Sequence, residues 1–267
     1  MLESPHQSCI PATPAFLMSQ MSDPAIVSAI CSPFLNSKDN LVQNSGLDFT
    51  KQEAFSLHLV QTVLIPNIIQ MINVNNSEAM QNLPKLAELI IDNFPNDGVD
   101  LIKNHILPAL LNNYRSSPSP ANSDSFYLIA NIISTIPIEN RDHITVDIIS
   151  KISCEAETKM RLLALHLIPL VNDSNLVLDH FRSLSLDRAI PVKCELIKML
   201  PECHFDQSFI NYLLLNSIKD QNISIRRTAA SIYGKIAPDL LDTFTPLLEN
   251  PDTVRAALKS VQPIVAK

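Results

Sequence analysis

The stretch that decides the fold reads IRRTAASIYGKI and runs from Ile225 to Ile236. It opens on an aliphatic residue, a basic residue (Arg226) follows directly, and apolar residues stand at positions +4, +7 and +11 from the first. These offsets fall along one face of an α-helix, so they predict a helix with a single narrow apolar stripe. Such a stripe needs a neighbouring element to cover it, because one helix or one helix pair cannot bury it alone.

The same pattern occurs four times in the second half of the chain. Its aliphatic anchors are Met160, Val192, Ile225 and Val254, which lie 32, 33 and 29 residues apart. The basic residues after them are Arg161, Lys193, Arg226 and Arg255. The apolar sets are Ala164/Leu167/Val171, Leu196/Met199/Cys203, Ala229/Ile232/Ile236 and Leu258/Val261/Val265. Position +9 holds a residue that disturbs helices: Pro169, Pro201, Gly234 and Pro263. Recurrence at this period predicts an all-α repeat protein, an α-α superhelix in which antiparallel helix pairs stack as a solenoid.

Each stripe-bearing helix is the second of a predicted pair. The first helices are predicted over residues 143–152, 174–185, 206–219 and 239–249. Short polar turns join the two, and their residues are the candidate binding sites: Glu155, Glu157, Asp187, Arg188, Asp220, Gln221, Asn222, Asn250 and Asp252. Acidic and amide side chains at these places suit the capping of a helix N-terminus and the positive end of its dipole.

The basic residue after each anchor lies beside the stripe rather than on it. We expect these residues to pair with acidic turn residues of a neighbouring repeat, which would form a ladder of modest electrostatic ties. The acidic residues in question are Glu155, Asp187, Asp220 and Asp252. The alternative is a basic line that binds a partner. The +9 proline removes a backbone hydrogen bond, so we expect a kink there.

The first half shows weaker copies of the unit. Two similar hexamers, LIPNII around Pro66 and ILPALL around Pro108, predict first helices with a proline kink. Partner helices are expected at Ala79/Leu83/Leu86/Ile90 and at Phe126/Ala130/Ile133. Between them, Ser117 and Ser119 precede prolines in an inserted loop and are candidate phosphorylation sites, the alternative being an unmodified loop. We divide the chain into a disordered or frayed segment (1–21), a weakly patterned helical lead-in (22–54) and an array of about six helix pairs (55–267), clearest from 142.

Composition disfavours several classes of partner and of binding site. The net charge of −7 disfavours nucleic acid and anionic membranes as partners. Three glycines are too few for phosphate-binding loops, and no apolar run reaches membrane-spanning length. Five widely spaced cysteines indicate reduced thiols, and we see no secretory signal, so we expect a cytoplasmic, or also a nuclear, protein.

Motifs of catalysis and metal binding are missing from the sequence. It lacks GxGxxG, GxxxxGK[ST], HExxH and GxSxG, and none of its seven histidines precedes a glutamate. Cys203 and His204 are adjacent, but Cys203 occupies a predicted core position. We therefore expect no catalytic, cofactor or metal site, no small-molecule substrate, and a protein that is not an enzyme.

Residues 219–230, KDQNISIRRTAA, resemble a HEAT repeat, and the likeness to this HEAT/armadillo-type class covers roughly residues 55–267. The aliphatic-basic pair Met160-Arg161 with Pro169 at +9 is more particularly similar to the scaffold (A) subunit of protein phosphatase 2A, and also to the regulatory subunit of phosphatase 4. Residues 244–255, FTPLLENPDTVR, resemble the same subfamily.

This resemblance implies a non-catalytic scaffold or regulator. In that family the intra-repeat turns line up as a ridge, on which a serine/threonine phosphatase catalytic subunit and a regulatory subunit dock. The alternative is a karyopherin-, adaptor- or cytoskeleton-associated HEAT module. A tubulin-binding array would typically carry tryptophan and basic residues in its turns, whereas this chain has no tryptophan and acidic or amide turns.

Overall fold

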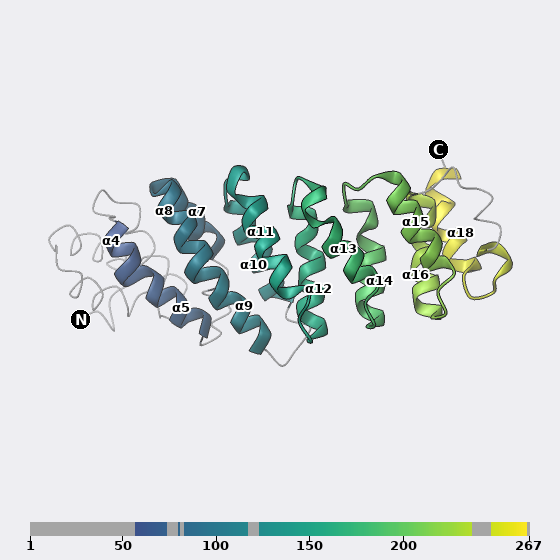
Figure 1. Ribbon diagram of the computed structural model, residues 1–267, viewed down its shortest axis with the longest axis horizontal. Coiled ribbons are helices and arrows are strands. Elements are labelled where there is room, and N and C mark those ends of the chain that lie inside the picture. Colours follow the sequence, from purple (N-terminus) through teal and green to yellow (C-terminus); the bar gives the residue numbers. More distant parts are fainter. Residues whose placement is uncertain (1–56, 74–79, 81–82, 117–122, 237–246, 266–267) are drawn as a thin grey trace, which may run out of the picture. The chain divides into compact units, whose positions relative to one another are not determined.

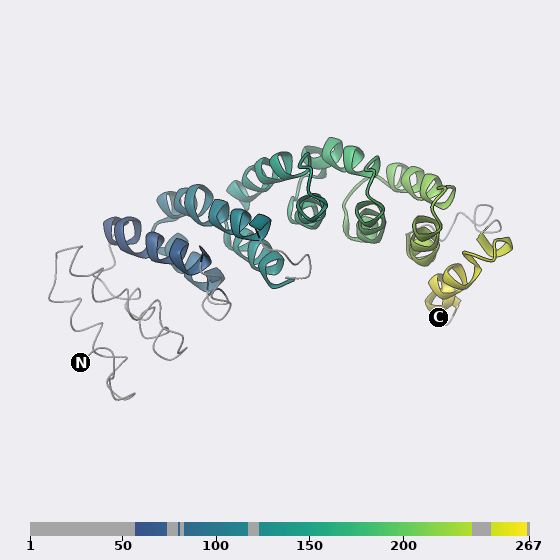
Figure 2. The ribbon, with the colours of Figure 1, turned by 90° about the horizontal axis from the view of Figure 1, so that it is seen from below.

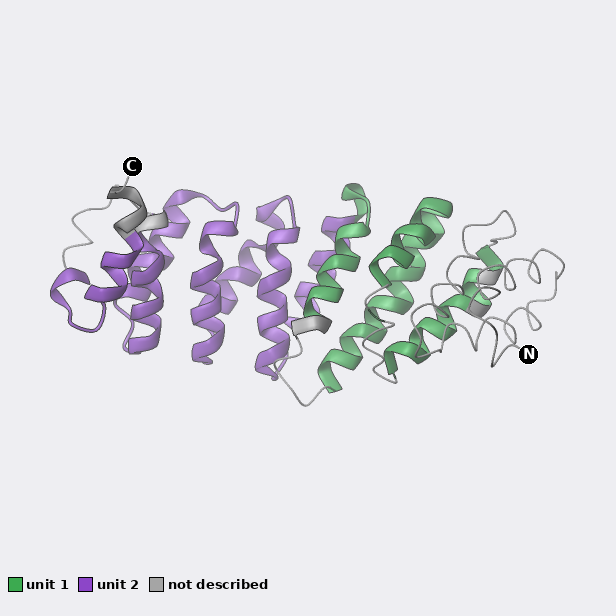
Figure 3. Ribbon diagram, turned by 180° about the vertical axis from the view of Figure 1, so that it is seen from behind, with its two compact units in different colours: residues 1–140 green, residues 141–267 purple. Residues whose placement is uncertain are grey.

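The computed structural model describes residues 57–73, 80, 83–116, 123–236 and 247–265. Within these ranges every regular element is a helix, which confirms the all-α fold class (Figure 1). The predictions for residues 1–21 and 22–54, for Ser117 and Ser119, and for most of the helix at 239–249 lie outside the described residues. The chain forms two compact units, residues 1–140 and 141–267 (Figure 3).

The first unit is built from two long helical rods and the helices that follow them. One rod consists of α4 (Leu57–Leu59), the π-helical turn η3 (Val60–Leu64) and α5 (Ile65–Asn73). The other consists of α8 (Pro95–Leu101), the π-helical turn η4 (Ile102–Ile106) and α9 (Leu107–Ser116). The helices beside the rods are α7 (Leu83–Asn93) and α10 (Ser123–Thr135). Rod packs against rod through α5 and α9, and α7 packs against α10.

Both rods accommodate a proline in the same way. Each π-helical turn ends two residues before a proline, Pro66 in one rod and Pro108 in the other. Proline cannot donate a hydrogen bond to the carbonyl four residues earlier, whereas a π-turn moves the bonding to the fifth residue. In the second rod the Leu107 N–H donates to the Ile102 carbonyl, five residues earlier. In both rods, therefore, a widened π-helical turn ends at the same distance before the proline of the hexamer.

The stripe predicted for the first of the partner helices is confirmed at its three described members, Ala79 lies outside the described residues, and the second stripe is shifted. Leu83, Leu86 and Ile90 of α7 are buried. In α10 the fully buried residues are Ile129, Ile132 and Ile133, together with Ile136 just beyond its end, whereas Phe126 and Ala130 are only half-buried. The predicted α10 stripe is thus wrong except at Ile133, because isoleucines on the adjacent face bury more apolar surface.

A glycine permits close contact between α7 and α8. A Cβ atom at Gly98 would lie 2.8 Å from the Ile90 carbonyl oxygen. Only glycine leaves room for this approach of one backbone to another. Gly98 therefore helps to fix how α8 sits on α7.

The second unit contains the clear repeats. Its first helices are α11 (Ile138–Ile152), which begins in the first unit, then the 3-10 turn η6 (Ser174–Val177) with α13 (Leu178–Ser185), and α15 (Gln207–Ile218). Its second helices are α12 (Thr158–Leu167), α14 (Ile190–Met199), α16 (Ile223–Ile236) and α18 (Val254–Val265). Each second helix packs against the next. Figure 2 shows α12, α14 and α16 end-on in one row, with α13 and α15 in another.

The predicted apolar stripe is buried in three of the four copies. The buried members are Met160, Ala164, Leu167 and Val171; Val192, Leu196, Met199 and Cys203; and Ile225, Ala229 and Ile232. Ile236, the last member of the third set, is half-buried. The stripe therefore forms the core between successive second helices, as the spacing predicts.

The fourth copy is shifted by one residue. Among the side chains described in this copy, Thr253, Ala257 and Ser260 are buried, whereas Leu258, the predicted +4 member, is 50% exposed. The side chains of the other two predicted members, Val261 and Val265, lie outside the described residues. Thr253 Oγ1 donates to the Leu247 carbonyl at 2.8 Å, and Ser260 Oγ donates to the Ala257 carbonyl at 2.7 Å. Because both hydroxyls find backbone acceptors, small polar side chains can be buried here. The anchor of this copy is Thr253, so the prediction of Val254 is wrong.

Two of the +9 prolines, Pro169 and Pro201, end helices instead of kinking them, whereas Pro263 lies within α18. Pro169 lies in a 3-10 turn, η5 (Ile168–Leu170), directly after α12, and Pro201 lies in η7 (Leu200–Glu202) directly after α14. The following residues, Val171 and Cys203, have extended backbone conformations. The expected kink is wrong for these two copies, because a tight 3-10 turn closes the helix before a carbonyl is left unpaired.

The register shift predicts different effects of the same substitution at two +4 positions. Leu196 is 2% exposed, so Leu196→Ala should lower the free energy of unfolding by about 2–5 kcal/mol. Leu258→Ala should change it by less than about 0.5 kcal/mol, since that side chain is half exposed. Urea unfolding followed by circular dichroism checks both, and equal losses would contradict the shifted register.

Candidate binding site along the turns

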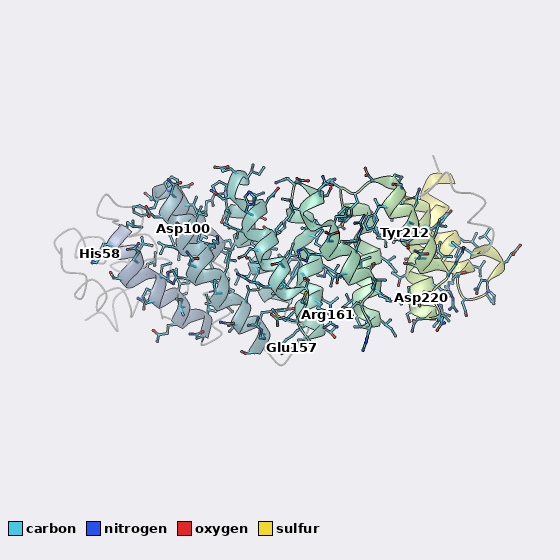
Figure 4. All side chains as sticks on the ribbon, viewed as in Figure 1. His58, Asp100, Glu157, Arg161, Tyr212 and Asp220 are labelled. Atoms are coloured by element: carbon cyan, nitrogen blue, oxygen red, sulfur yellow. The ribbon has the colours of Figure 1, made fainter. Side chains whose placement is uncertain are left out.

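All nine predicted site residues lie between a first and a second helix of the second unit. They precede α12 (Glu155, Glu157), α14 (Asp187, Arg188), α16 (Asp220, Gln221, Asn222) and α18 (Asn250, Asp252). Figure 4 shows Glu157, Arg161 and Asp220 along one edge of this unit. We call the nine residues the turn edge.

The predicted electrostatic ladder is present, and its first rung is the strongest. Arg161 Nε lies 2.6 Å from Asp187 Oδ2, and Arg161 Nη2 lies 3.2 Å from Asp187 Oδ1. The two side chains are 16% and 7% exposed. A two-point contact between a guanidinium and a carboxylate that are both largely shielded from water is stronger and more directional than a surface ion pair.

Arg161 also binds the turn that precedes its own helix. Its Nη1 donates to the backbone carbonyls of Glu155 and Ala156, at 2.7 Å each. One guanidinium thus joins its own turn to the turn of the next repeat, 26 residues later. The five donors of arginine, held in a planar fork, allow this double role.

Arg226 repeats the arrangement two repeats further along. Its Nη1 donates to the carbonyls of Asp220 and Gln221 at 3.0 and 2.8 Å, and its Nη2 lies 3.1 Å from Asp252 Oδ2. Arg227 approaches the same carboxylate at 3.8 Å and donates to the Asp252 carbonyl at 3.0 Å. The buried Arg226 Nε has no hydrogen-bond partner among the described residues, so this rung is a one-point contact.

The middle rung uses a lysine and is the longest. Lys193 Nζ lies 3.4 Å from Asp220 Oδ2, and the two side chains are 29% and 22% exposed. An ammonium group on a flexible stem is a point charge that lacks the fork of arginine. We therefore rank this rung as the weakest of the three.

Each rung aspartate, or an asparagine beside it, also shapes its own turn. Asp187 Oδ1 accepts from the Ala189 N–H at 2.7 Å, and Asp220 Oδ1 accepts from the Asn222 N–H at 2.8 Å. In the last turn Asn250 Oδ1 accepts from the Asp252 N–H at 2.9 Å. These are side-chain turns that close on the residue two positions later.

The capping prediction therefore needs correction for the acidic residues. The residues that directly precede α12 and α14 are Glu157 and Ala189, and neither makes a side-chain cap. Asn222 does cap its helix, since its Oδ1 accepts from the Ser224 N–H at 2.8 Å. The aspartates bind the turn backbone instead, because they stand too early to reach the helix N-terminus.

The remaining predicted residues have less constrained roles. Glu157 is half exposed and lies 3.3 Å from Lys159, while Arg188 and Gln221 are exposed. Glu155 enters the ladder through its backbone carbonyl. Arg255 lies beyond the three rungs, which follows from the shifted register: the residue directly after the buried Thr253 is Val254.

The ladder lowers the pKa of Asp187. Burial opposes ionisation of this carboxyl, but hydrogen bonds from Arg161 and from the Ala189 N–H outweigh burial, so the pKa lies below its ordinary value. The ionised form is thereby favoured in the folded protein. The rung must weaken when acid protonates the carboxylate.

Among the described residues of the second unit, the titratable side chains outside the ladder include one with a raised pKa and one with a lowered pKa. Across the described ranges, no group of three or more His, Cys, Asp or Glu side chains is placed to hold a metal ion. Burial raises the pKa of the Cys203 thiol to about 12, which leaves it a poor nucleophile. Burial also lowers the pKa of His166, although Glu195 lies 3.4 Å away and opposes the shift. Among the helices that can be described, none combines the length and hydropathy needed to cross a bilayer.

No model of a protein family matches this chain, and no curated protein sequence matches it.

Several contacts in the structure cannot be predicted from the sequence pattern. Arg227 as a second cation on Asp252, and Thr253 as a buried anchor, have no signal in hydropathy. Asp142 is a further case, because its carboxylate accepts from the backbone N–H groups of Asn172 and Asp173 at 3.1 and 3.2 Å. The rung partners do have a signal: an arginine or lysine is followed by an aspartate 26 or 27 residues later.

Exchanging arginine and lysine between rungs should change stability in opposite directions. Arg161→Lys should lower the free energy of unfolding by about 2 kcal/mol, because lysine cannot bind two carbonyls and Asp187 together. Lys193→Arg should raise it, since a fork can reach both its own turn and Asp220. Urea unfolding tests the pair, and a stabilising Arg161→Lys would contradict the double role.

The first rung also predicts a pH dependence. Because the folded-state pKa of Asp187 is lowered, its contribution to stability is complete above its unfolded pKa of about 3.9 and is lost as the pH falls through the folded value. Asp187→Asn should therefore destabilise the protein at neutral pH, and its difference from the native chain should shrink below about pH 4. A difference that is constant with pH, measured by urea unfolding, would rule out the ionised rung.

Proposed function

We propose that this chain is a non-catalytic scaffold or regulatory protein with a HEAT-type α-α superhelix, and that it binds other proteins through the turn edge. The observation that carries the proposal is the ladder of three ion pairs, Arg161–Asp187, Lys193–Asp220 and Arg226–Asp252. Each pair ties one turn to the next. A row of turns held in this way presents side chains at fixed spacing, which lowers the ordering cost of binding an extended partner surface.

The turn residues differ in how far they are buried, and this difference supports the proposal. The rung aspartates are half-buried and already engaged, whereas Glu157, Arg188 and Gln221 are exposed beside them. The half-buried aspartates thus hold the turns in place, and the exposed side chains remain available to contact a partner. Loop residues on a rigid helical support are a common location for binding sites.

The identity of the partner is proposed from the sequence resemblance. The aliphatic-basic pair at the start of α12 and its proline at +9 resemble the scaffold subunit of protein phosphatase 2A and the regulatory subunit of phosphatase 4. We therefore propose a phosphatase 2A-type serine/threonine catalytic subunit as the partner, with a regulatory subunit beside it. In this role the chain contributes positioning and no chemistry.

Binding of a purified phosphatase 2A-type catalytic subunit to the full chain tests the proposal. A Glu157→Lys/Gln221→Lys variant changes only exposed turn side chains, and it should weaken binding about tenfold or more. Glu202→Lys is the matched control, because Glu202 is exposed at the opposite end of α14 from the Asp187 turn, and its binding should equal that of the native chain.

Affinity purification from cell lysate with mass spectrometry sets this proposal against the alternatives. Recovery of the catalytic subunit, reduced in the double variant and retained in the control, supports it. Recovery instead of a nuclear-transport GTPase, coat proteins or tubulin, with no affinity for the purified catalytic subunit, would overturn it in favour of the other HEAT modules.

A further inference from the structure

A cavity of about 230 Å³ opens within the second unit, between the Asp187 turn and the Asp220 turn. Its lining comes from the end of α13, the middle of α14, the middle and end of α15 and the start of α16. Leu196, Leu213 and Ile225 supply buried apolar side chains, and the Lys193–Asp220 rung borders it. The cavity therefore belongs to the same edge as the ladder.

Two exposed apolar side chains also line this cavity. Leu186 is 80% exposed and Tyr212 is 63% exposed, the highest values among large apolar side chains of the described residues. They come from different repeats, Leu186 from the end of α13 and Tyr212 from α15. Single exposed apolar residues are ordinary, but two of them on one apolar cavity mark a binding surface.

The uncompensated charges next to the two rung aspartates in the sequence are positive. Asp187 is engaged by Arg161, and Asp220 is engaged by Lys193, so neither carboxylate adds uncompensated negative charge. Arg188 directly follows the first aspartate and Lys219 directly precedes the second, and both are exposed. In a chain with a net charge of −7, this local excess of cations favours an acidic ligand.

We propose that this cavity binds a short segment of a partner protein in which one large aliphatic or aromatic side chain is flanked by aspartate or glutamate. The apolar side chain enters between Leu186 and Tyr212, and the acidic residues face Arg188 and Lys219. This inference specifies which kind of protein segment the turn edge binds, and it therefore rests on the proposal that the turn edge binds protein.

The size of the cavity fits such an anchor. An aliphatic cavity of about 150 Å³ takes up a benzene-sized molecule, so the volume here suffices for a leucine or phenylalanine side chain. Binding energy at protein interfaces concentrates in anchors of this kind, with charged residues around them setting specificity and association rate.

Selection from a random peptide library on the purified full chain provides the probe, and fluorescence anisotropy of a selected, labelled peptide provides the measurement. We expect enrichment of peptides with a leucine, phenylalanine or similar residue next to acidic residues. Replacing that apolar residue by serine should weaken binding about tenfold or more.

Matched variants locate the site. Tyr212→Ala and Leu186→Ala should each weaken the peptide about tenfold. Tyr127→Ala and Leu258→Ala should leave it unchanged, because these side chains are comparably exposed, at 60% and 50%, but do not line the cavity. Arg188→Glu with Lys219→Glu should weaken binding and remove most of its salt dependence. All substituted side chains are exposed, so the fold is retained.

Three results would overturn the inference: no enriched peptide, enriched peptides that are basic, or affinities equal in the Tyr212→Ala and Tyr127→Ala variants. The purified chain is the only protein in this experiment. The chain can therefore bind the peptide although no phosphatase subunit is recovered, and it can recover a phosphatase subunit without binding the peptide. The two experiments thus test the two proposals separately.

Discussion

The second unit depends on one interaction, the contact of an arginine with both its own turn and the aspartate of the next. Arg161 shows it most fully, with two carbonyl acceptors in its own turn and a two-point contact with Asp187. The guanidinium fork makes this geometry possible, and the partial burial of both side chains strengthens it relative to a surface pair. Since Asp187 also closes its own turn, this rung fixes two turns and the distance between them.

Apolar packing and the ladder have complementary roles. Apolar packing, which includes the buried stripe on α12, α14 and α16, supplies most of the stabilisation, because burial of aliphatic side chains contributes about 25 cal/mol per Å² of apolar surface. Burial is not directional, so a stripe alone tolerates sliding between neighbouring helices. The rungs then fix the register at the turn end.

The sequence was informative where a residue type and its spacing determine the outcome. Periodicity located the second helices and three of the four stripes, and the charge pattern predicted ion pairs between neighbouring repeats, which three of the four predicted basic residues form. The sequence pattern failed where backbone hydrogen bonding decides the outcome. Thr253 and Ser260 are buried because their hydroxyls bind carbonyls, and Pro169 and Pro201 close their helices through 3-10 turns. The cavity beside Leu186 and Tyr212 was also missed, since it forms between side chains of separate repeats. The phosphatase assignment remains a proposal from the resemblance.

Amide hydrogen exchange in an Arg161→Ala variant tests the central claim that a rung fixes two successive turns. Faster exchange is expected in the turn that contains Glu155 and also in the next one, where the Ala189 N–H bonds Asp187. The turn at Asp220, held by the other rungs, should exchange as in the native chain. Faster exchange confined to the first turn, or spread evenly over the unit, would contradict the account.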